Sequence, residues 1–308
     1  MMIDKFFFFV KKSINEYYSS MSQIIHAQPV KKKITKELKL QCKELAEKGV
    51  IPFLKVVLVG QNPASVIYTN SKKKYCEKIG AKCEIVTLDE NISETSFLQK
   101  MNEINQDSDV DGCIIQLPLP PQLKHLNVGL LVDQKKDVDG FHPENLYAVL
   151  SNQIDDDHFV SCTPKGIITL LQENHIELKG KHVVIIGRSM IVGKPLAMLF
   201  TNLNATVTLC HTKTENLKKF TQSADIIVCA TGAFKFFDRS YLNSNKNQIL
   251  VDVGVSSYAE GHVCGDVNFD DVVDHVAAIT PVPGGVGPMT IVSLTQNLLQ
   301  ASKKRLSL

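Results

Sequence analysis

The sequence predicts an α/β protein of two domains, the second of them a Rossmann-type nucleotide-binding domain. Two observations support this prediction. Apolar, strand-like runs alternate with amphipathic helical stretches from about residue 30 onward. In the second half of the chain, a buried strand leads into a glycine-containing turn, and three more strand-like runs follow it.

Length and composition are those of a globular protein. The chain has 308 residues, which is enough for two domains, and it is 44% hydrophobic and 21% charged. Its net charge of +2 makes neither nucleic acid nor an anionic membrane a required partner. Eight scattered cysteines show no zinc-ligand spacing, so we expect no metal site and a reducing, cytoplasmic location.

Residues 1–20 are expected to be a disordered extension. The apolar run at 6–10 is too short to span a bilayer, and no small-residue cleavage site follows it. A more ordinary globular pattern begins at Met21.

The first predicted domain covers residues 21–160. Its expected elements are a helix at 31–48, a strand at 53–59, a helix at 64–79, a strand at 82–88, a helix at 93–105 and a strand at 112–116. The stretch 117–165 is rich in Pro and Asp, so it reads as connecting segments of the kind that line a cleft.

The second predicted domain covers residues 161–285. A helix at 163–173 leads into strands expected at 182–186, 205–210, 225–230 and 248–253. An apolar helix at 289–302 is expected to pack back on the first domain, so that residues 286–308 complete that domain.

The turn after the first strand of this second domain is a candidate phosphate-binding loop. It contains Gly187, Arg188 and Ser189, and Gly193 follows at the start of the next helical stretch. Glycine lets the backbone approach a pyrophosphate, and a helix N-terminus offers N–H groups to it. The turn is not a GxGxxG motif and is weak evidence alone; the surrounding strands favour the cofactor interpretation.

The next strand indicates which dinucleotide is bound. NAD-specific sites commonly carry Asp or Glu at its end, whereas here it is followed by His211, Thr212 and Lys213. Arg188, Thr212 and Lys213 could bind a 2′-phosphate, which favours NADP over NAD. Lys213 could equally be a solvated surface charge.

Tyr68 and Lys72 are candidate reactive groups in the first domain. Their spacing of four places them on one face of the predicted helix, where a lysine and a phenol can take part in proton transfer. The alternative is a solvated lysine-rich face. Short-chain dehydrogenases also have a YxxxK helix, but there it follows the glycine-rich turn within one domain, whereas here it comes more than a hundred residues before that turn.

Three further polar residues lie at strand ends or turns. Gln116 ends an apolar strand, and its amide can both donate and accept hydrogen bonds, as the edge of a pterin-like ring requires. Asp137 and Asp139 flank one residue of an extended stretch, so they should point the same way as like charges. A solvated acidic turn is the alternative.

Taken in order, the motifs resemble those of the bifunctional methylenetetrahydrofolate dehydrogenase/methenyltetrahydrofolate cyclohydrolase family. The similarity covers about residues 23–301, and it rests on SVIYTNSKKKYCEKIG, QLPLP, KDVDGFHPEN, CTPKG, IIGRSMIVGKPLA, VTLCHTKT, DIIVCATG, VDVGV, GDVNF and TPVPGGVGPMT. TPVPGGVGPMT and KDVDGFHP are the most specific of these.

The resemblance implies an activity and a role for each matching residue. The enzyme would oxidise 5,10-methylenetetrahydrofolate with NADP and hydrolyse the methenyl product to 10-formyltetrahydrofolate. Lys72 would be the catalytic lysine, with Gln116 modulating it, Asp139 holding the pterin edge and Tyr68 near the folate rings. Pro283 and Gly284 would contact the folate or shape its cleft. NADP would be bound by Gly187, Arg188, Ser189, Thr212 and Val255.

The family is usually a homodimer, so we expect a homodimer here, with a folate as the small-molecule partner. Two other interpretations remain. One is a monofunctional dehydrogenase on the same fold, and the other is a nucleotide-binding regulator without enzymatic activity. The presence of Lys72 and Gln116 favours the bifunctional enzyme.

Overall fold

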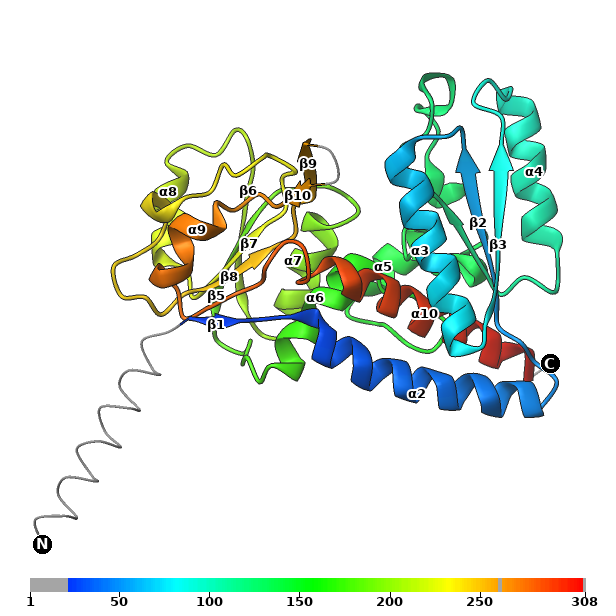
Figure 1. Ribbon diagram of the computed structural model, residues 1–308, viewed down its shortest axis with the longest axis horizontal. Coiled ribbons are helices and arrows are strands. Elements are labelled where there is room, and N and C mark those ends of the chain that lie inside the picture. The colour runs from blue at the N-terminus through cyan, green and yellow to red at the C-terminus, as the bar shows by residue number, and fades with distance from the viewer. Residues whose placement is uncertain (1–21, 260–261, 307–308) are drawn as a thin grey trace, which may run out of the picture. The chain divides into compact units, whose positions relative to one another are not determined.

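The computed structural model describes residues 22–259 and 262–306 (Figure 1). These residues form two compact units, which we name after their main sheets. The three-stranded unit comprises residues 27–176, 189–202 and those from 287 onward. The six-stranded unit comprises the described residues up to 26, together with 177–188 and 203–286. The predicted extension at 1–20 lies outside the described residues.

A parallel sheet in the order β3-β2-β4 forms the centre of the three-stranded unit. Its strands are β2 (Phe53–Val59), β3 (Lys82–Leu88) and β4 (Gly112–Ile115). β2 pairs with β3 along its whole length and with β4 over most of it. A central parallel strand is covered on both faces, which explains why β2 is the near-continuous apolar run FLKVVLV.

Three helices alternate with these strands, as the sequence predicted. They are α2 (Ala27–Glu47), α3 (Pro63–Ile79) and α4 (Glu94–Gln106). The ends of α3 follow from local chemistry. Asn62 accepts hydrogen bonds from the first free backbone N–H groups, and Gly80 ends the helix in the left-handed conformation at φ 95°. α2 begins one turn earlier than expected.

The stretch between β4 and the second half of the chain is more ordered than predicted. It contains three 3-10 turns at Pro121–Leu123, Val128–Leu130 and Gln134–Lys136, and then α5 (Pro143–Ser151). The sequence analysis missed α5 because the Pro- and Asp-rich composition of 117–165 was taken as typical of connecting segments. Proline is well tolerated in the first turn, where its missing N–H would have no partner.

Two helices that follow in sequence also belong to the three-stranded unit. They are α6 (Cys162–Glu173) and α7 (Gly193–Asn202). α7 packs against α5 and α6. The sequence placed both helices in the second domain, so the compact units divide the chain differently from the expected boundary at residue 160.

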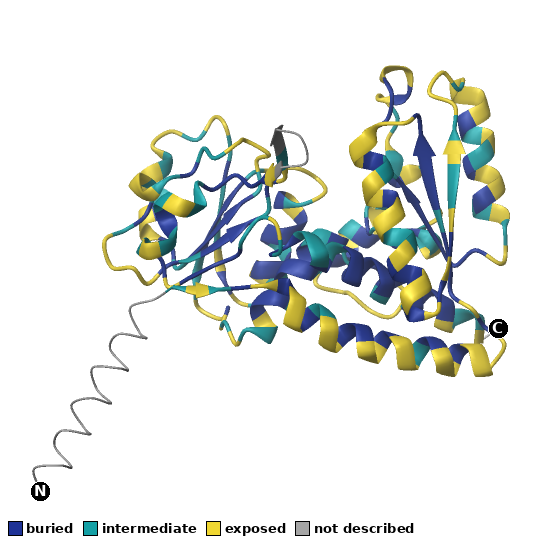
Figure 2. Cartoon of the chain, viewed as in Figure 1, coloured by how far each residue is buried: buried dark blue, intermediate teal, exposed yellow. Residues whose placement is uncertain are grey.

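The C-terminal helix α10 (Gly287–Lys303) is the most deeply buried helix of the three-stranded unit (Figure 2). It packs against α2 and α6. It also lies close to β4, where a Cβ on Gly112 would stand 3.0 Å from the Leu298 side chain. The prediction that this helix packs back on the first α/β layer is therefore confirmed.

The six-stranded unit is built on a parallel sheet in the order β1-β11-β8-β7-β5-β6. The four predicted strands are present as β5 (His182–Ile186), β6 (Thr206–Cys210), β7 (Ile226–Cys229) and β8 (Ile249–Asp252). The edge strand β1 (Gln23–Ile24) and its neighbour β11 (Ala278–Ile279) were not predicted. Two residues are too few to show an alternating pattern.

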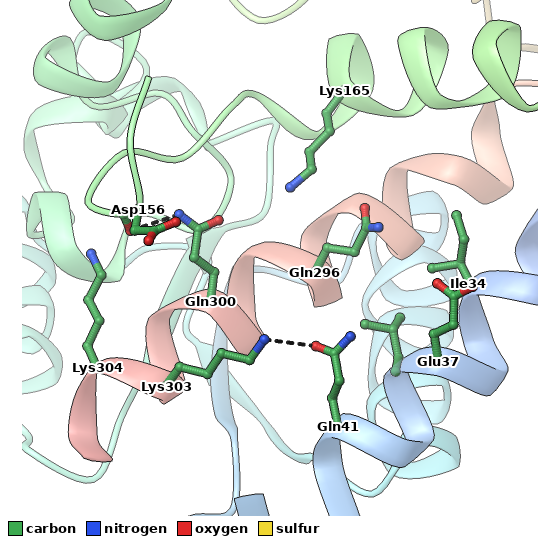
Figure 3. Close-up of a pocket in the computed structure, with 10 residues that line it drawn as sticks. Ile34, Glu37, Gln41, Asp156, Lys165, Gln296, Gln300, Lys303 and Lys304 are labelled. Atoms are coloured by element: carbon green, nitrogen blue, oxygen red, sulfur yellow. Dashed lines mark hydrogen bonds between the residues drawn. The ribbon is translucent and has the colours of Figure 1, made fainter. Parts of the chain in front are cut away.

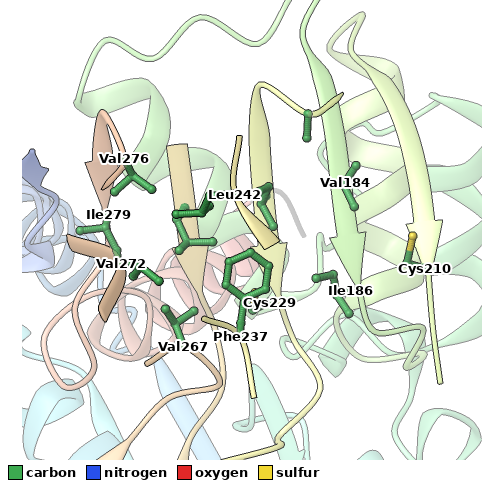
Figure 4. Packing of buried hydrophobic residues seen from close by; sticks show 13 residues of the cluster. Val184, Ile186, Cys210, Cys229, Phe237, Leu242, Val267, Val272, Val276 and Ile279 are labelled. Carbon is green, nitrogen blue, oxygen red and sulfur yellow. The ribbon is translucent and has the colours of Figure 1, made fainter. Parts of the chain in front are cut away.

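Smaller elements complete this unit. They are α8 (Leu217–Ser223), α9 (Phe269–Val272) and the antiparallel pair β9 (Ser256–Ala259) and β10 (His262–Cys264). Its apolar core lies against one side of the sheet (Figure 4), where Phe237 is fully buried and stacks on Tyr241 with ring centres 5.0 Å apart. Among the described residues, no helix has the length and apolar content needed to span a membrane.

Candidate active site

Lys72 is held in place by Gln116. It lies on α3, and its Nζ donates to the side-chain oxygen of Gln116 at 2.9 Å. The backbone N–H of Gln116 continues the sheet by donating to Val57 at 2.8 Å, which fixes the residue just beyond the end of β4. Its amide nitrogen donates to the Leu117 carbonyl at 2.8 Å. The amide is therefore oriented with its oxygen toward the lysine.

Asp139 lies within the electrostatic reach of Lys72. Burial raises the pKa of the Asp139 carboxyl, and the positive charge of Lys72 and a hydrogen bond from Cys162 oppose that shift. Tyr68 lies one turn before Lys72 on the same face of α3, and its side chain is 39% exposed. Partial burial raises the pKa of its phenol. The structure thus brings Lys72, Gln116 and Asp139 together, with Tyr68 on the same helix face.

Cys162 is a member of this cluster that the sequence analysis did not single out. Its thiol donates to the Val138 carbonyl at 3.2 Å, and its backbone N–H donates to the Asp139 carbonyl at 3.2 Å. Burial and the nearby Asp139 charge raise the pKa of this thiol well above its usual value. Cys162 therefore stays a hydrogen-bond donor. Its place in CTPKG, directly after the Asp-rich loop, was the available signal.

Asp137 and Asp139 were expected to act as a pair of like charges, but they have different surroundings. Asp137 is buried and accepts hydrogen bonds from the His142 backbone at 2.6 Å and from the Asn145 amide at 2.8 Å. Burial raises the pKa of Asp137 to about 7, and the repulsion from Asp139 is a smaller contribution. Asp137 thus shapes the loop, whereas Asp139 belongs to the cluster around Lys72.

The predicted cofactor residues of the six-stranded unit lie after three of its parallel strands. Gly187 follows β5, Thr212 lies beyond the end of β6, and Val255 lies beyond the end of β8. Carboxyl ends of parallel strands share one edge of a sheet, where ligands of such folds bind. Gly187 has φ 127°, and a Cβ there would stand 2.2 Å from the Ala230 carbonyl oxygen. Glycine is thus required by the neighbouring backbone, a reason the sequence did not reveal.

The other polar groups near this edge are solvent-accessible. Arg188, Thr212 and Lys213 are exposed, and no carboxylate directly follows β6. Ser189 begins the segment that leads into α7, where its hydroxyl accepts from the Val192 backbone at 3.2 Å. Ser189 belongs to the three-stranded unit, whereas the rest of the predicted cofactor set belongs to the six-stranded unit.

Two buried aspartates that sequence reasoning did not single out order the loops at this edge. Asp252 accepts from the backbone N–H groups of Gly254, Asp266 and Val267, each at 3.0 Å. Asp266 accepts from the Thr231 backbone at 2.6 Å and from its hydroxyl at 2.9 Å. These bonds connect the loops after β7 and β8, so they hold the loops at the carboxyl edge of the sheet in fixed positions. The VDVGV and GDVNF motifs that contain the two aspartates were the available signal.

The Pro/Gly loop that contains Pro283 and Gly284 also belongs to the six-stranded unit. The Val282–Pro283 peptide bond is cis, and Gly284 has φ 106°, a conformation that favours glycine. Gly285 donates to the Pro281 carbonyl at 2.8 Å and closes the turn. The predicted contact of Pro283 and Gly284 with a folate stays a prediction.

Family models match both halves of the chain. The model for the catalytic domain of tetrahydrofolate dehydrogenase/cyclohydrolase matches residues 25–139, and the model for the NAD(P)-binding domain of the same enzymes matches residues 161–306. The chain belongs to the tetrahydrofolate dehydrogenase/cyclohydrolase family. The Lys72 cluster lies in the first matched segment except for Cys162, and the glycine turn after β5 lies in the second.

Individual relatives of this tetrahydrofolate dehydrogenase/cyclohydrolase agree over nearly the whole chain. The bifunctional protein FolD of Bacillus cytotoxicus is 43% identical over 281 residues, which are 91% of this chain and 96% of the relative. The crystal structure of the FolD dehydrogenase/cyclohydrolase from Campylobacter jejuni is 40% identical, with a TM-score of 0.88, and the match covers 92% of this chain and 99% of that one.

A third relative has been solved with ligands. The Trypanosoma brucei methylenetetrahydrofolate dehydrogenase-cyclohydrolase, complexed with NADP cofactor and inhibitor, is 29% identical with a TM-score of 0.87, and the match covers 94% of this chain and 99% of that one. The predicted fold class and family are thus confirmed. The chain is an enzyme of folate one-carbon chemistry, a methylenetetrahydrofolate dehydrogenase and methenyltetrahydrofolate cyclohydrolase.

Proposed function

We propose that Lys72 is the proton-transfer group of the cyclohydrolase step and that NADP is the electron acceptor of the dehydrogenase step. The observation that carries this proposal is the bond from the Lys72 ammonium to the oriented amide of Gln116, with the Asp139 carboxyl nearby. In this assignment the dehydrogenase oxidises 5,10-methylenetetrahydrofolate, and the cyclohydrolase converts the methenyl product into 10-formyltetrahydrofolate.

The two steps make different demands on these residues. Oxidation leaves a methenyl carbon with positive charge shared by two flanking nitrogens, and it requires mainly that the substrate be correctly placed. Hydrolysis requires water to add at that carbon and protons to move before the ring opens. Lys72 can donate and accept the proton, Gln116 keeps its Nζ in position, and Asp139 accepts from the N–H groups of the pterin edge. Tyr68 offers a half-exposed ring against the folate.

NADP, when bound, supplies the hydride acceptor. The described residues fit this cofactor. Gly187 presents bare backbone at the carboxyl edge of the sheet, and the segment from Ser189 leads into the N-terminus of α7. Arg188 and Thr212 are exposed and can bind a 2′-phosphate, which a carboxylate after β6 would repel. Val255 offers an apolar contact that is 48% exposed.

Pro283 and Gly284 are proposed to contact the folate; Gly284 has no side chain, and the bond from Gly285 to the Pro281 carbonyl closes their turn. We assign folate binding and catalysis to residues 21–160 with 286–308, and NADP binding to 161–285. A homodimer in the cytoplasm is proposed as the working state. All eight cysteines are free and buried, which suits a reducing compartment. Sedimentation velocity of the purified chain tests the dimer.

One absorbance experiment tests the activities together. Methylenetetrahydrofolate oxidation is followed with NADP and with NAD side by side, and hydrolysis of methenyltetrahydrofolate is followed separately. The proposal expects both activities and a higher kcat/KM with NADP. Oxidation without hydrolysis would instead support a monofunctional dehydrogenase, and faster turnover with NAD would overturn the cofactor assignment.

A further inference from the structure

Asn297 is a fully buried amide on α10 that contacts the backbone next to Asp139. Its Nδ2 donates to the Val138 carbonyl at 2.9 Å and to the Val160 carbonyl at 3.0 Å. The same nitrogen lies 3.8 Å from the Cys162 sulfur. A buried amide is costly to leave without hydrogen-bond partners, so the groups around Asn297 constrain one another. The amide oxygen accepts from Lys165, whose Nζ lies at 2.7 Å.

Lys165 and the two carbonyls together determine which way the Asn297 amide points. An ammonium group can only donate, so the atom that faces it must be the amide oxygen. The amide nitrogen then faces the two carbonyls, which can only accept. Lys165 thus acts on the backbone beside Asp139 through the orientation of Asn297.

The two carbonyls lie on chain segments that meet at the site. Val138 precedes Asp139, and Val160 lies two residues before Cys162, whose backbone N–H donates to the Asp139 carbonyl at 3.2 Å. The Cys162 thiol donates to the same Val138 carbonyl at 3.2 Å. The Asn297 amide therefore joins two chain segments. One carries the Asp139 carboxyl, which is proposed to bind the pterin, and the other carries Cys162.

We propose that Asn297, oriented by Lys165, is a positioning residue that holds the Asp139 carboxyl in its folate-binding place. The inference rests on the proposed function of Asp139. Asn297 itself makes no contact with the substrate in this assignment. It acts through the peptide that joins Val138 to Asp139, so its loss should change folate binding in both reactions and leave NADP binding unchanged.

Lys165 lines a polar cavity of about 550 Å³ (Figure 3). The cavity is lined by residues of α2, α6 and α10, by Lys304 of the 3-10 turn after α10 and by Asp156 of the loop before α6, and by none of the predicted site residues. Figure 3 shows the Lys165 side chain directed toward Gln296 and Gln300 of α10. Because the cavity is polar and roomy, a changed side chain at 165 can be accommodated there without disrupting the apolar core.

The first test replaces the amide by an isosteric acid. Asn297→Asp keeps the shape but loses both N–H donors, so the Val138 and Val160 carbonyls face a carboxylate. Gln300→Glu is the matched control. Gln300 lies on the same helix, and its amide also joins two backbone carbonyls, those of Asp156 at 2.9 Å and His158 at 3.1 Å, away from Asp139. Both variants should be characterised in the full-length enzyme.

We expect Asn297→Asp to raise the KM for methylenetetrahydrofolate and for methenyltetrahydrofolate about tenfold or more. A change of this size corresponds to the loss of about one charge-assisted hydrogen bond between the Asp139 carboxyl and the folate. The KM for NADP should stay within about twofold of the wild-type value. Gln300→Glu should leave all three KM values near wild type. Equal effects of the two variants, or a rise in the NADP KM as large as that for the folates, would overturn the proposal.

The second test keeps Asn297 and removes the donor that faces its oxygen. Lys165→Glu presents an acceptor in place of the ammonium, so position 165 competes with the Val138 and Val160 carbonyls for the amide nitrogen. Lys303→Glu makes the same charge change in the same cavity wall. The folate KM should rise for the first variant alone. If Asn297→Asp does not fold, equal folate KM values for these two variants reject the inference.

These outcomes are separable from a failure of the proposed function. If the wild-type enzyme lacks hydrolysis or prefers NAD, the function assignment fails. If the wild type is active as proposed and the folate KM values do not distinguish Asn297→Asp from Gln300→Glu, only the positioning role fails.

Discussion

At the scale of single residues, the site depends on how a lysine ammonium is held without being neutralised by a direct ion pair. The Lys72 Nζ donates to a neutral amide oxygen of Gln116, and the Asp139 carboxyl acts on it electrostatically from nearby. An amide partner fixes the position of the ammonium while leaving its other N–H groups for substrate or water. This arrangement suits a group that must pass a proton to a reacting molecule.

Lys72→Met should abolish most of the cyclohydrolase activity while leaving NADP binding intact. Removal of a general acid–base group typically costs about 100-fold or more in rate, and methionine keeps the apolar stem of the lysine. Hydrolysis of methenyltetrahydrofolate and NADP affinity by fluorescence titration are the measurements. Lys74→Met makes the same change at an exposed position of the same helix and should keep both properties. Full cyclohydrolase activity in Lys72→Met would remove this residue from the mechanism.

Burial also raises the pKa of Asp137, a carboxyl near Asp139 that shapes the loop. Its pKa is raised to about 7 in the folded protein, against an ordinary value of 3.8. Between these values the folded state holds a proton that the unfolded state has lost. The contribution of Asp137 to folding is therefore most favourable below about pH 4 and is lost as the pH rises toward 7.

Asp137→Asn should make the stability of the protein less sensitive to pH in that range. The asparagine oxygen can still accept from His142 and Asn145, but it cannot lose a proton. Urea unfolding at pH 5 and pH 8 measures the effect. The free energy of unfolding of the variant minus that of the wild type should be more positive at pH 8 than at pH 5. The opposite order would contradict the raised pKa of Asp137.

At the scale of elements, α3 determines where the reactive side chains lie. Its start is set by Asn62, whose side-chain oxygen accepts from Ala64 at 3.1 Å and Ser65 at 3.2 Å. Its end is set by Gly80, so Tyr68 and Lys72 occupy fixed turns of a helix with defined limits. Both signals are local and were readable in the sequence, which is why α3 was predicted within one residue of its observed bounds.

Asn62→Ala should destabilise the protein by about 1 kcal/mol, because two N–H groups at the helix start lose their acceptor. The change is measured by urea unfolding. Ser93→Ala removes the corresponding cap of α4, where the hydroxyl accepts from Ser96 at 3.2 Å, and should cost a similar amount. Unchanged stability in both variants would show that the caps contribute little.

At the scale of the whole molecule, each unit depends on segments far apart in the sequence. In the six-stranded unit, Gln23 and Ile25 donate backbone hydrogen bonds to Ala277 at 2.9 Å and Ile279 at 2.7 Å, which makes β1 an edge strand of the sheet. Ser22 adds hydrogen bonds from its hydroxyl to the Val273 and Val276 carbonyls. Ordered contacts to this sheet therefore begin at residue 22 in the described part of the chain.

Deletion of residues 2–20 should leave folding and both activities near wild type, because β1 and its neighbours are retained. Deletion of residues 2–25 removes β1 and the fully buried Ile25, and should lower the thermal unfolding temperature by several degrees. Thermal unfolding and the two activity assays distinguish these outcomes. Loss of folding or activity in the shorter deletion would give the extension a structural or functional role.

The sequence by itself determined the features that depend on near neighbours. Helix caps, apolar strands and the spacing of Tyr68 and Lys72 are local, and the ordered motifs were specific enough to indicate the family. Tertiary structure decided the rest. Gly187 is needed because Ala230 comes within reach, the thiol of Cys162 reaches Val138, and Asn297 of the last helix holds the backbone beside Asp139. Such contacts join residues tens to more than a hundred positions apart, and no local pattern encodes which distant groups meet when apolar faces are buried together.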